Sequence, residues 1–268
     1  MFNLLRMDLY RVKRSKSVYV CLGILVFVTV FGFWLMWLLG SDEGHKISLA
    51  MGMLTTEELF ESESILAGVD FLGFFSQICL DGGAYNVIFG VWVMLFVCGD
   101  FQSGFIKNIM ALHQNRWKYI GSKVLTVWIV DFCYLALHLL SALMLNRIFG
   151  NLVPDAMWKD ILFYLSWVWF LTTAFGALII FICVLTRSVA AASLAAVLLG
   201  GGVVVMALYG ILNLFHAGEW LKYSIYLTCA EGPEKYTSVK NLYVYVVGIG
   251  FLILYTVLSG MILRKKDI

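Results

Sequence analysis

Long apolar runs separated by short polar segments dominate the chain. Six runs carry no or almost no charged residue, and each is 18 to 27 residues long. A helix needs about 20 apolar residues to cross the hydrocarbon core of a bilayer. The sequence therefore predicts an all-α membrane protein in which residues 1–268 form a single transmembrane domain. The six predicted spans are Val18–Leu39, Gly82–Gly99, Val124–Leu145, Ile161–Thr186, Val189–Phe215 and Leu242–Leu263.

Two of these runs contain glycines that predict a break. The apolar stretch Phe71–Leu80 precedes the second run. The sequence Asp-Gly-Gly at 81–83, which includes the first two residues of that run, predicts a break between an interfacial segment and the span. The glycine triplet at 200–202 predicts a bend in the fifth run. Small residues also recur every four positions there and form a candidate helix-packing or dimer face, at Ala192, Ala196 and Gly200.

The composition agrees with a membrane protein. Of 268 residues, 62% are hydrophobic and 13% are charged, whereas soluble domains have about 45–50% and about 25%. A net charge of +2 gives no reason to expect a nucleic-acid partner. The six cysteines form no CxxC motif and suggest no disulfide framework, although a pair between Cys79 and Cys229, outside the spans, stays open.

The distribution of basic residues predicts the orientation. Thirteen of the 19 Lys and Arg residues lie in the N-terminal segment, the second and fourth loops and the C-terminus. Because basic residues are retained on the cytoplasmic side, both termini are predicted to be cytoplasmic. The first outer loop is acidic, and a capping box from Thr55 to Glu58 predicts a short helix through Leu66.

The cytoplasmic segments are too short for a catalytic domain. They amount to 48 residues, and an independent domain usually needs about 100. The chain also has no phosphate-binding loop, HExxH zinc motif or GxSxG nucleophile motif. We therefore expect no catalytic, cofactor-binding or metal-binding residue and no enzyme activity, so that any ATP hydrolysis belongs to a separate subunit.

Two cytoplasmic segments are predicted to be amphipathic helices. The leader Met1–Ser17 is typical of a helix in the membrane interface, with an apolar stripe at Phe2, Leu5, Leu9 and Val12. The loop 100–123 has apolar residues at helical spacing, with Asp100 as the expected N-cap, at Phe101, Phe105, Ile109 and Leu112. Docking into a groove of a soluble partner and contact with anionic lipid both fit this second pattern.

At this point the chain resembles the ABC-2 type permeases. The resemblance lies in six spans with a basic amphipathic leader and in an acidic residue closing the second span, with polar positions after it at Ser103, Gly104, Arg116 and Lys123. The family more often has Glu where this chain has Asp100. The resemblance implies the transmembrane subunit of a bacterial ABC exporter, of the multidrug or the bacteriocin and lantibiotic immunity type, in the cell membrane.

The same resemblance implies partners and roles. It implies a second permease chain, identical or different, and an ATP-binding-cassette ATPase that binds ATP and Mg²⁺. The leader becomes an elbow helix, and the stretch Glu219–Thr228 a re-entrant segment. The coupling helix that contacts the ATPase then involves Asp100, Phe101, Ser103, Gly104, Phe105, Lys107, Ile109, Leu112 and Arg116.

One carboxylate lies inside the six predicted spans. Asp131 is in the third span, and His138 follows seven positions later on the same helical face. Such a group is costly in lipid and is expected to face protein or water. We favour a structural hydrogen bond to a neighbouring helix over a proton relay or a substrate contact.

The function expected from these patterns is that of a permease subunit exporting a peptide, drug or lipid-like molecule. Two alternatives stay open. One is a secondary carrier driven by protons through Asp131 and His138, and the other is a non-transporting immunity or scaffold protein.

Overall fold

The computed structural model describes residues 2–50, 69–112, 115–215 and 218–265, and within these ranges it is helical without a strand. The prediction of an all-α protein is confirmed. Five helices are long and apolar enough to cross a membrane, or six if a bent pair counts as one span. They are α2 (Lys16–Gly40), α6 (Ala84–Gln102), α8 (Arg116–Ile148), α9 (Trp158–Thr186), η3 (Val239–Leu242) continued by α13 (Tyr243–Lys265), and the pair α10 (Val189–Gly200) and α11 (Val203–Asn213).

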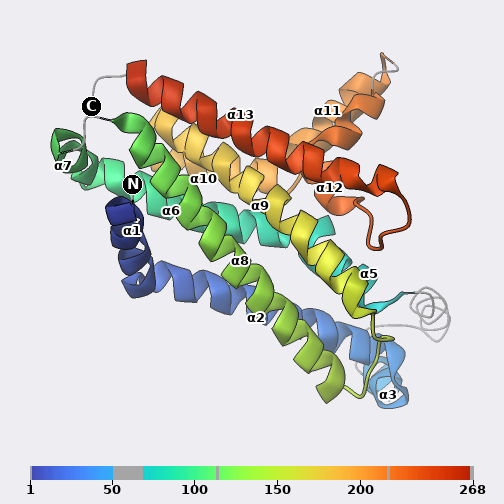
Figure 1. Cartoon of the computed structure of the whole chain (residues 1–268). Coiled ribbons are helices and arrows are strands. Elements are labelled where there is room, and N and C mark those ends of the chain that lie inside the picture. The colour runs from blue at the N-terminus through green and yellow to red at the C-terminus, as the bar shows by residue number, and fades with distance from the viewer. Residues whose placement is uncertain (1, 51–68, 113–114, 216–217, 266–268) are drawn as a thin grey trace.

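The most buried of the long helices is α9. It packs along α13 and also contacts α6, α8 and α10 (Figure 1). Its large aromatic side chains Tyr164 and Trp167 are fully buried. A helix that is hydrophobic all round has to be covered by other helices or by lipid, and α9 is covered mainly by the rest of the chain.

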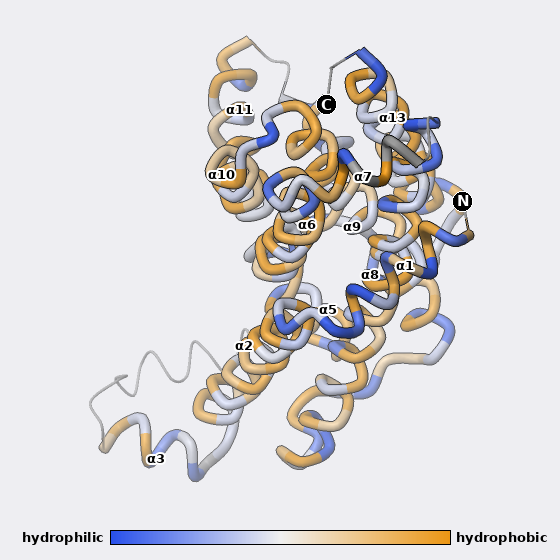
Figure 2. The backbone as a smooth tube through the Cα atoms, turned by 90° about the vertical axis from the view of Figure 1, so that its left-hand side faces the viewer, coloured by the Kyte–Doolittle hydropathy of each residue, from blue (hydrophilic) through white to orange (hydrophobic). Residues whose placement is uncertain are grey.

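The other long helices expose apolar side chains on the outside of the bundle. Phe27 of α2, Leu140 of α8 and Val246 of α13 are each more than half exposed. Figure 2 shows hydrophobic residues along most of the helical length and hydrophilic ones mainly toward the helix ends. Exposed apolar surface of this extent is typical of contact with lipid rather than water, so the chain is a multi-pass membrane protein.

The bend predicted in the fifth run is confirmed. Helices α10 and α11 meet at 59°, and Gly202, at the start of α11, has a φ of 73°, a backbone conformation that favours glycine. The run predicted as a span over Val189–Phe215 is thus divided into two helices, which count as a sixth span only when taken together. In the described residues α11 has no buried side chain, and it points away from the main bundle (Figure 1).

The small-residue stripe of α10 packs inside the chain. Ala192, Ala196 and Gly200 are buried, and α10 lies against α6. A side chain added at Gly200 would meet the backbone of Val87 in α6. The stripe thus allows two helices of the same chain to approach closely.

The break before the second span is also confirmed. Asp70 caps α5 (Phe71–Ser76) by accepting a hydrogen bond from the Gly73 amide, and a π-helical turn, η1 (Gln77–Asp81), follows. Gly83 then adopts a φ of 69° and precedes α6. It also lies against the carbonyl of Gly200, where a Cβ atom would collide with the oxygen. The turn before α6 and the turn after α10 therefore pack directly on each other.

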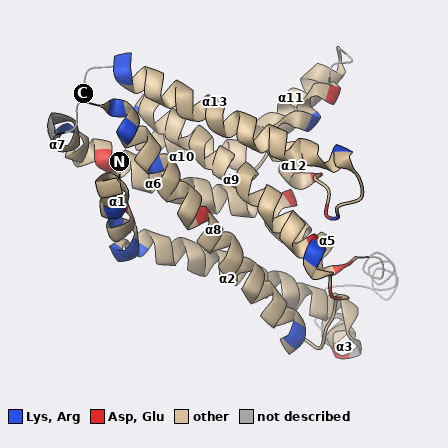
Figure 3. Cartoon of the chain, viewed as in Figure 1, with Lys and Arg blue, Asp and Glu red and all other residues tan. Residues whose placement is uncertain are grey.

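Both termini lie at one end of the bundle. Helix α1 (Phe2–Arg14), helix α7 (Phe105–Leu112) and the C-terminal end of α13 lie there (Figure 1), and basic residues gather at this end (Figure 3). Helix α8 begins at Arg116, eight residues before the predicted third span, and so carries Lys118 and Lys123 into the helical bundle. We call this end the termini side.

The opposite end contains α3 (Asp42–Ala50), α5 and the loop before α13. Lys235 of that loop lies 2.5 Å from Asp70. Burial raises the pKa of Asp70, but hydrogen bonds from Lys235 and the Gly73 amide outweigh it, so the net pKa lies below its usual value. The stretch Glu219–Thr228, which the resemblance implies to be re-entrant, lies in the short helices η2 (Gly218–Tyr223) and α12 (Ile225–Ala230). The predicted helix from Thr55 to Leu66 lies outside the described residues.

The contact between Gly83 and Gly200 generates a stability prediction. Gly83→Ala should lower the melting temperature in detergent, because a Cβ atom collides with the Gly200 carbonyl and the positive φ disfavours alanine. Gly82→Ala is the matched control, since its Cβ would meet nothing within 4 Å and its φ is −72°. Equal melting temperatures for the two variants, measured by thermal scanning fluorimetry, would contradict this role for Gly83.

Candidate functional site

Four charged side chains meet where α1, α6 and α8 come together on the termini side. The ammonium of Lys123 lies 2.8 Å from Asp8 Oδ1 and 2.7 Å from Asp100 Oδ2. Arg11 Nη2 lies 2.7 Å from Asp100 Oδ1. The side chains of Lys123 and Asp100 are fully buried and that of Asp8 almost fully. We call Asp8, Arg11, Asp100 and Lys123 the charge cluster.

Neutral donors add hydrogen bonds to the two carboxylates. Tyr119 donates its hydroxyl hydrogen to Asp100 Oδ2 at 3.0 Å, and Ser122 donates to Asp8 Oδ2 at 2.9 Å. The ammonium of Lys123 also lies 4.0 Å from the centre of the Phe96 ring, an attractive geometry for a cation. Every carboxylate oxygen of the charge cluster thus faces a cation or a hydroxyl.

The charge cluster has two positive and two negative groups, so it is electrically balanced. Each buried ion would cost several kcal/mol to remove from water, and only close pairing with hydrogen bonds offsets this cost. Removing one partner leaves the others unpaired, which typically costs about 3–5 kcal/mol. The charge cluster therefore fixes how α1, α6 and α8 sit together.

Helix α7 begins five residues after Asp100 of the charge cluster. It is separated from α6 by a turn in which Gly104 has a φ of 68°. The guanidinium of Arg11 stacks over the Phe105 ring at 4.4 Å, and Ile106 and Ile109 are buried. The same arginine therefore contacts both Asp100, at the end of α6, and the first residue of α7.

The prediction that Asp100 caps a helix was wrong. Asp100 lies within α6, which runs to Gln102, and its carboxylate is occupied by Arg11, Lys123 and Tyr119. The strong charge pairing inside the bundle outweighs the modest gain from capping a surface helix. The predicted helix is therefore divided, with Phe101 in α6 and Phe105 in α7.

The remaining predicted coupling residues lie at the end of α6, in the turn after it, on α7 and at the start of α8. Phe101 lies under the guanidinium of Arg187 at 5.9 Å, and Ser103 donates a hydrogen bond to the Gly99 carbonyl. Lys107 is exposed on α7. Leu112 ends α7, and its side chain lies outside the described residues. Arg116 Nη1 donates to the carbonyls of Leu263 at 2.6 Å and of Arg264 at 2.9 Å, linking the start of α8 to the end of α13.

The buried face of α1 differs from the apolar stripe predicted for the leader by a rotation of about one residue along the helix. The inward face of α1 carries Leu4, Asp8 and Val12, whereas Phe2 is 85% exposed. The reason is that Asp8 has partners inside the bundle, so the helix turns this charged residue inward. Hydrophobic periodicity alone does not contain that information.

Asp131 and His138 occupy two separate polar contacts inside the bundle. Asp131 Oδ1 accepts a hydrogen bond from Tyr85 of α6 at 2.7 Å. Its Oδ2 lies 2.7 Å from the hydroxyls of Thr172 and Thr173 of α9. The structure therefore joins three apolar spans through one carboxyl group.

His138 lies between α2 and η1. The hydroxyl of Thr29 donates to the Leu25 carbonyl at 2.9 Å, so it accepts from His138 Nδ1, which lies 3.1 Å away. The other ring nitrogen, Nε2, then accepts from the thiol of Cys79 at 2.6 Å. Both ring nitrogens are satisfied with a neutral imidazole.

The cysteines are free in the structure, so Cys79 and Cys229 do not form a disulfide. Both are buried: Cys79 contacts His138, and Cys229 lies in α12.

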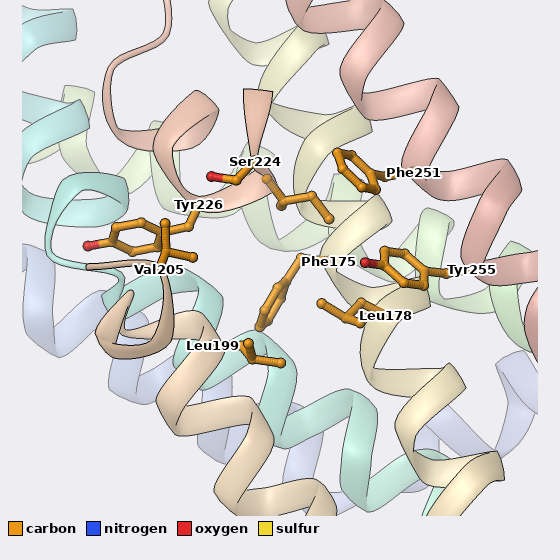
Figure 4. A pocket seen from close by; sticks show the side chains of 9 residues that line it. Phe175, Leu178, Leu199, Val205, Ser224, Tyr226, Phe251 and Tyr255 are labelled. Carbon is orange, nitrogen blue, oxygen red and sulfur yellow. The ribbon is translucent and has the colours of Figure 1, made fainter. Parts of the chain in front are cut away.

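A lateral apolar pocket of about 150 Å³ lies beside the bend of the fifth run. Helices α9, α10, α11, α12 and α13 all contribute to it, and Figure 4 shows Phe175, Leu178 and Tyr255 directed toward it. Apolar walls of this kind favour contact with an apolar group. The pocket can therefore hold part of an apolar molecule.

Sequence reasoning missed several residues of these sites. Asp8 and Arg11 were treated only as part of a basic leader, although an acid within a basic amphipathic segment is a usable signal for an internal ion pair. Thr172 and Thr173 form a hydroxyl pair within an otherwise apolar span, which is a comparable signal. Tyr85 and Thr29 carried no signal of their own.

Comparison of the chain with family models and with curated proteins finds no match.

The charge cluster generates a second stability prediction. Lys123→Met should destabilise the protein by about 3–5 kcal/mol, because Asp8 and Asp100 are left as buried, unpaired carboxylates. Lys118→Met, an exposed position on the same helix, is the control and should change little. Adding Asp8→Asn to Lys123→Met should recover part of the loss. Chemical denaturation in detergent measures all three, and a Lys123→Met variant as stable as the control would show that the charge cluster does not hold the helices.

Proposed function

We propose that this chain is the membrane-spanning permease subunit of an ATP-binding-cassette exporter, driven by a separate ATPase subunit. The observation that supports this most is the mounting of α7. A short helix with an exposed basic residue, Lys107, is held by the charge cluster at the base of α1, α6 and α8. In the proposal α7 is the coupling helix and α1 the elbow helix.

The charge cluster supports a mechanical role for α7. A displacement of α7 reaches Arg11 through Phe105, and from Arg11 it reaches Asp100 and Lys123. The contact of Arg116 with the C-terminal end of α13 extends this connection to the last span. Tightly packed helices move as rigid bodies, so force applied at α7 would tilt α6, α8 and α13 together.

The orientation follows from the same proposal. The ATPase, with its ATP and Mg²⁺, would lie on the termini side, which would then be cytoplasmic, in keeping with the basic residues there. The membrane would be the bacterial cell membrane, and a second permease chain, identical or different, would complete the transport path.

The lateral pocket supports an apolar cargo. Its walls are mainly aliphatic and aromatic. It lies beside α11, whose apolar side chains are exposed. A lipid-like molecule, a drug or the apolar part of a peptide suits such a site.

The proposal predicts that the exposed face of α7 binds the ATPase. The protein should be purified from its source cells with a mild detergent, and the ATPase that accompanies it should be quantified by mass spectrometry. Lys107→Glu should reduce the recovered ATPase at least several-fold, because it reverses a charge in the contact. Charge at Ile109 is a poorer probe, because this side chain faces inward and its replacement would disturb packing.

Lys118→Glu provides the matched control, since it makes the same charge reversal at an exposed position outside α7. Its ATPase recovery should equal that of the unmodified chain. Equal recovery with Lys107→Glu would remove the proposed coupling role. Transport by the purified chain alone in proteoliposomes, driven by a pH gradient without ATP, would instead support a secondary carrier.

A further inference from the structure

Asp131 is a carboxyl group enclosed by the apolar part of the bundle. Its side chain is fully buried. The titratable groups that face it are Tyr85 from α6 and, farther away, Cys229 from α12, while α9 contributes only the hydroxyls of Thr172 and Thr173. On α8 itself, His138 lies two turns away and is bonded to other partners.

No cation neutralises this carboxyl group. Among the described residues the ion pairs involve Asp8, Asp70 and Asp100, and none involves Asp131. An isolated charge within an apolar interior is so unfavourable that the group takes up a proton instead.

The hydrogen bonds around Asp131 accommodate both the protonated and the ionised form. Thr172 Oγ1 lies 2.7 Å from Asp131 Oδ2 and 2.9 Å from the Val168 carbonyl. With a protonated carboxyl, Asp131 donates to Thr172, which donates in turn to Val168. With a carboxylate, the Thr172 hydroxyl rotates and donates to Asp131. Tyr85 and Thr173 donate in both cases, so no polar atom loses its partner.

We propose that Asp131 is a proton-exchange site: it carries a proton while α6, α8 and α9 enclose it, and releases that proton to water when these helices separate. The proton leaves from Oδ2, and the carboxylate that remains is then hydrated. This inference does not depend on whether a separate ATPase drives the chain.

The exchange makes the arrangement of the helices sensitive to pH. The enclosed form binds one proton more than the open form. Linkage therefore requires that acid favours the enclosed form and that alkali favours the open form. Asp131→Asn cannot ionise and should remove this dependence, while its amide can still bond to the threonine hydroxyls.

Infrared spectroscopy of the full chain in lipid nanodiscs tests the proposal. At neutral pH the unmodified chain should show the C=O stretch of a protonated carboxylic acid, and this band should disappear reversibly at alkaline pH. Asp131→Asn should lack the band at neutral and at alkaline pH. His138→Gln is the matched control on the same helix and should keep both the band and its loss.

A conservative variant tests the assignment if Asp131→Asn does not fold. Tyr85→Phe removes the donor to Oδ1 and should shift the band to higher frequency without abolishing it. Absence of the band in the unmodified chain at neutral pH, or its presence in Asp131→Asn at neutral pH, would overturn the assignment of the proton. A band that persists unchanged to alkaline pH in the folded chain would overturn the exchange.

Discussion

The ammonium of Lys123, held between Asp8 and Asp100, is the interaction on which the termini side of the molecule depends. It brings a buried residue of α8 into contact with α1 and α6. Arg11 then extends the same set of charges to the first turn of α7. Because buried charges tolerate little displacement, the connection between α7 and the spans is stiff, as a force-transmitting contact requires.

The other half of the bundle is organised differently, by close backbone contact rather than charge. Gly83 and Gly200 let the start of α6 touch the end of α10, and Gly202 allows α11 to depart at 59°. This departure leaves α11 without buried side chains and opens the lateral pocket beside it. Charge pairing therefore organises the termini side, and close backbone contact organises the turns before α6 and after α10.

The sequence predicted the outline of this fold because lipid imposes a simple pattern. Long apolar runs specify helices, and the sequence Asp-Gly-Gly at 81–83 and the glycines at 200–202 indicated both breaks. The sites were harder to predict, since they depend on which distant side chains meet. Asp100 looked like a helix cap because its partners, Arg11 and Lys123, lie far away in the sequence. For the same reason the leader was assigned an apolar stripe that places Asp8 outward, whereas the structure turns it inward.

The most direct measurement of the central claim is photo-crosslinking in intact source cells, with a photoreactive amino acid at position 107 on α7 and, separately, at position 47 on α3. The account predicts an adduct with an ATP-binding-cassette ATPase from position 107 and none from position 47, because only the termini side faces the motor. The same adduct from position 47 alone, or no ATPase adduct from position 107 in cells that transport, would contradict it.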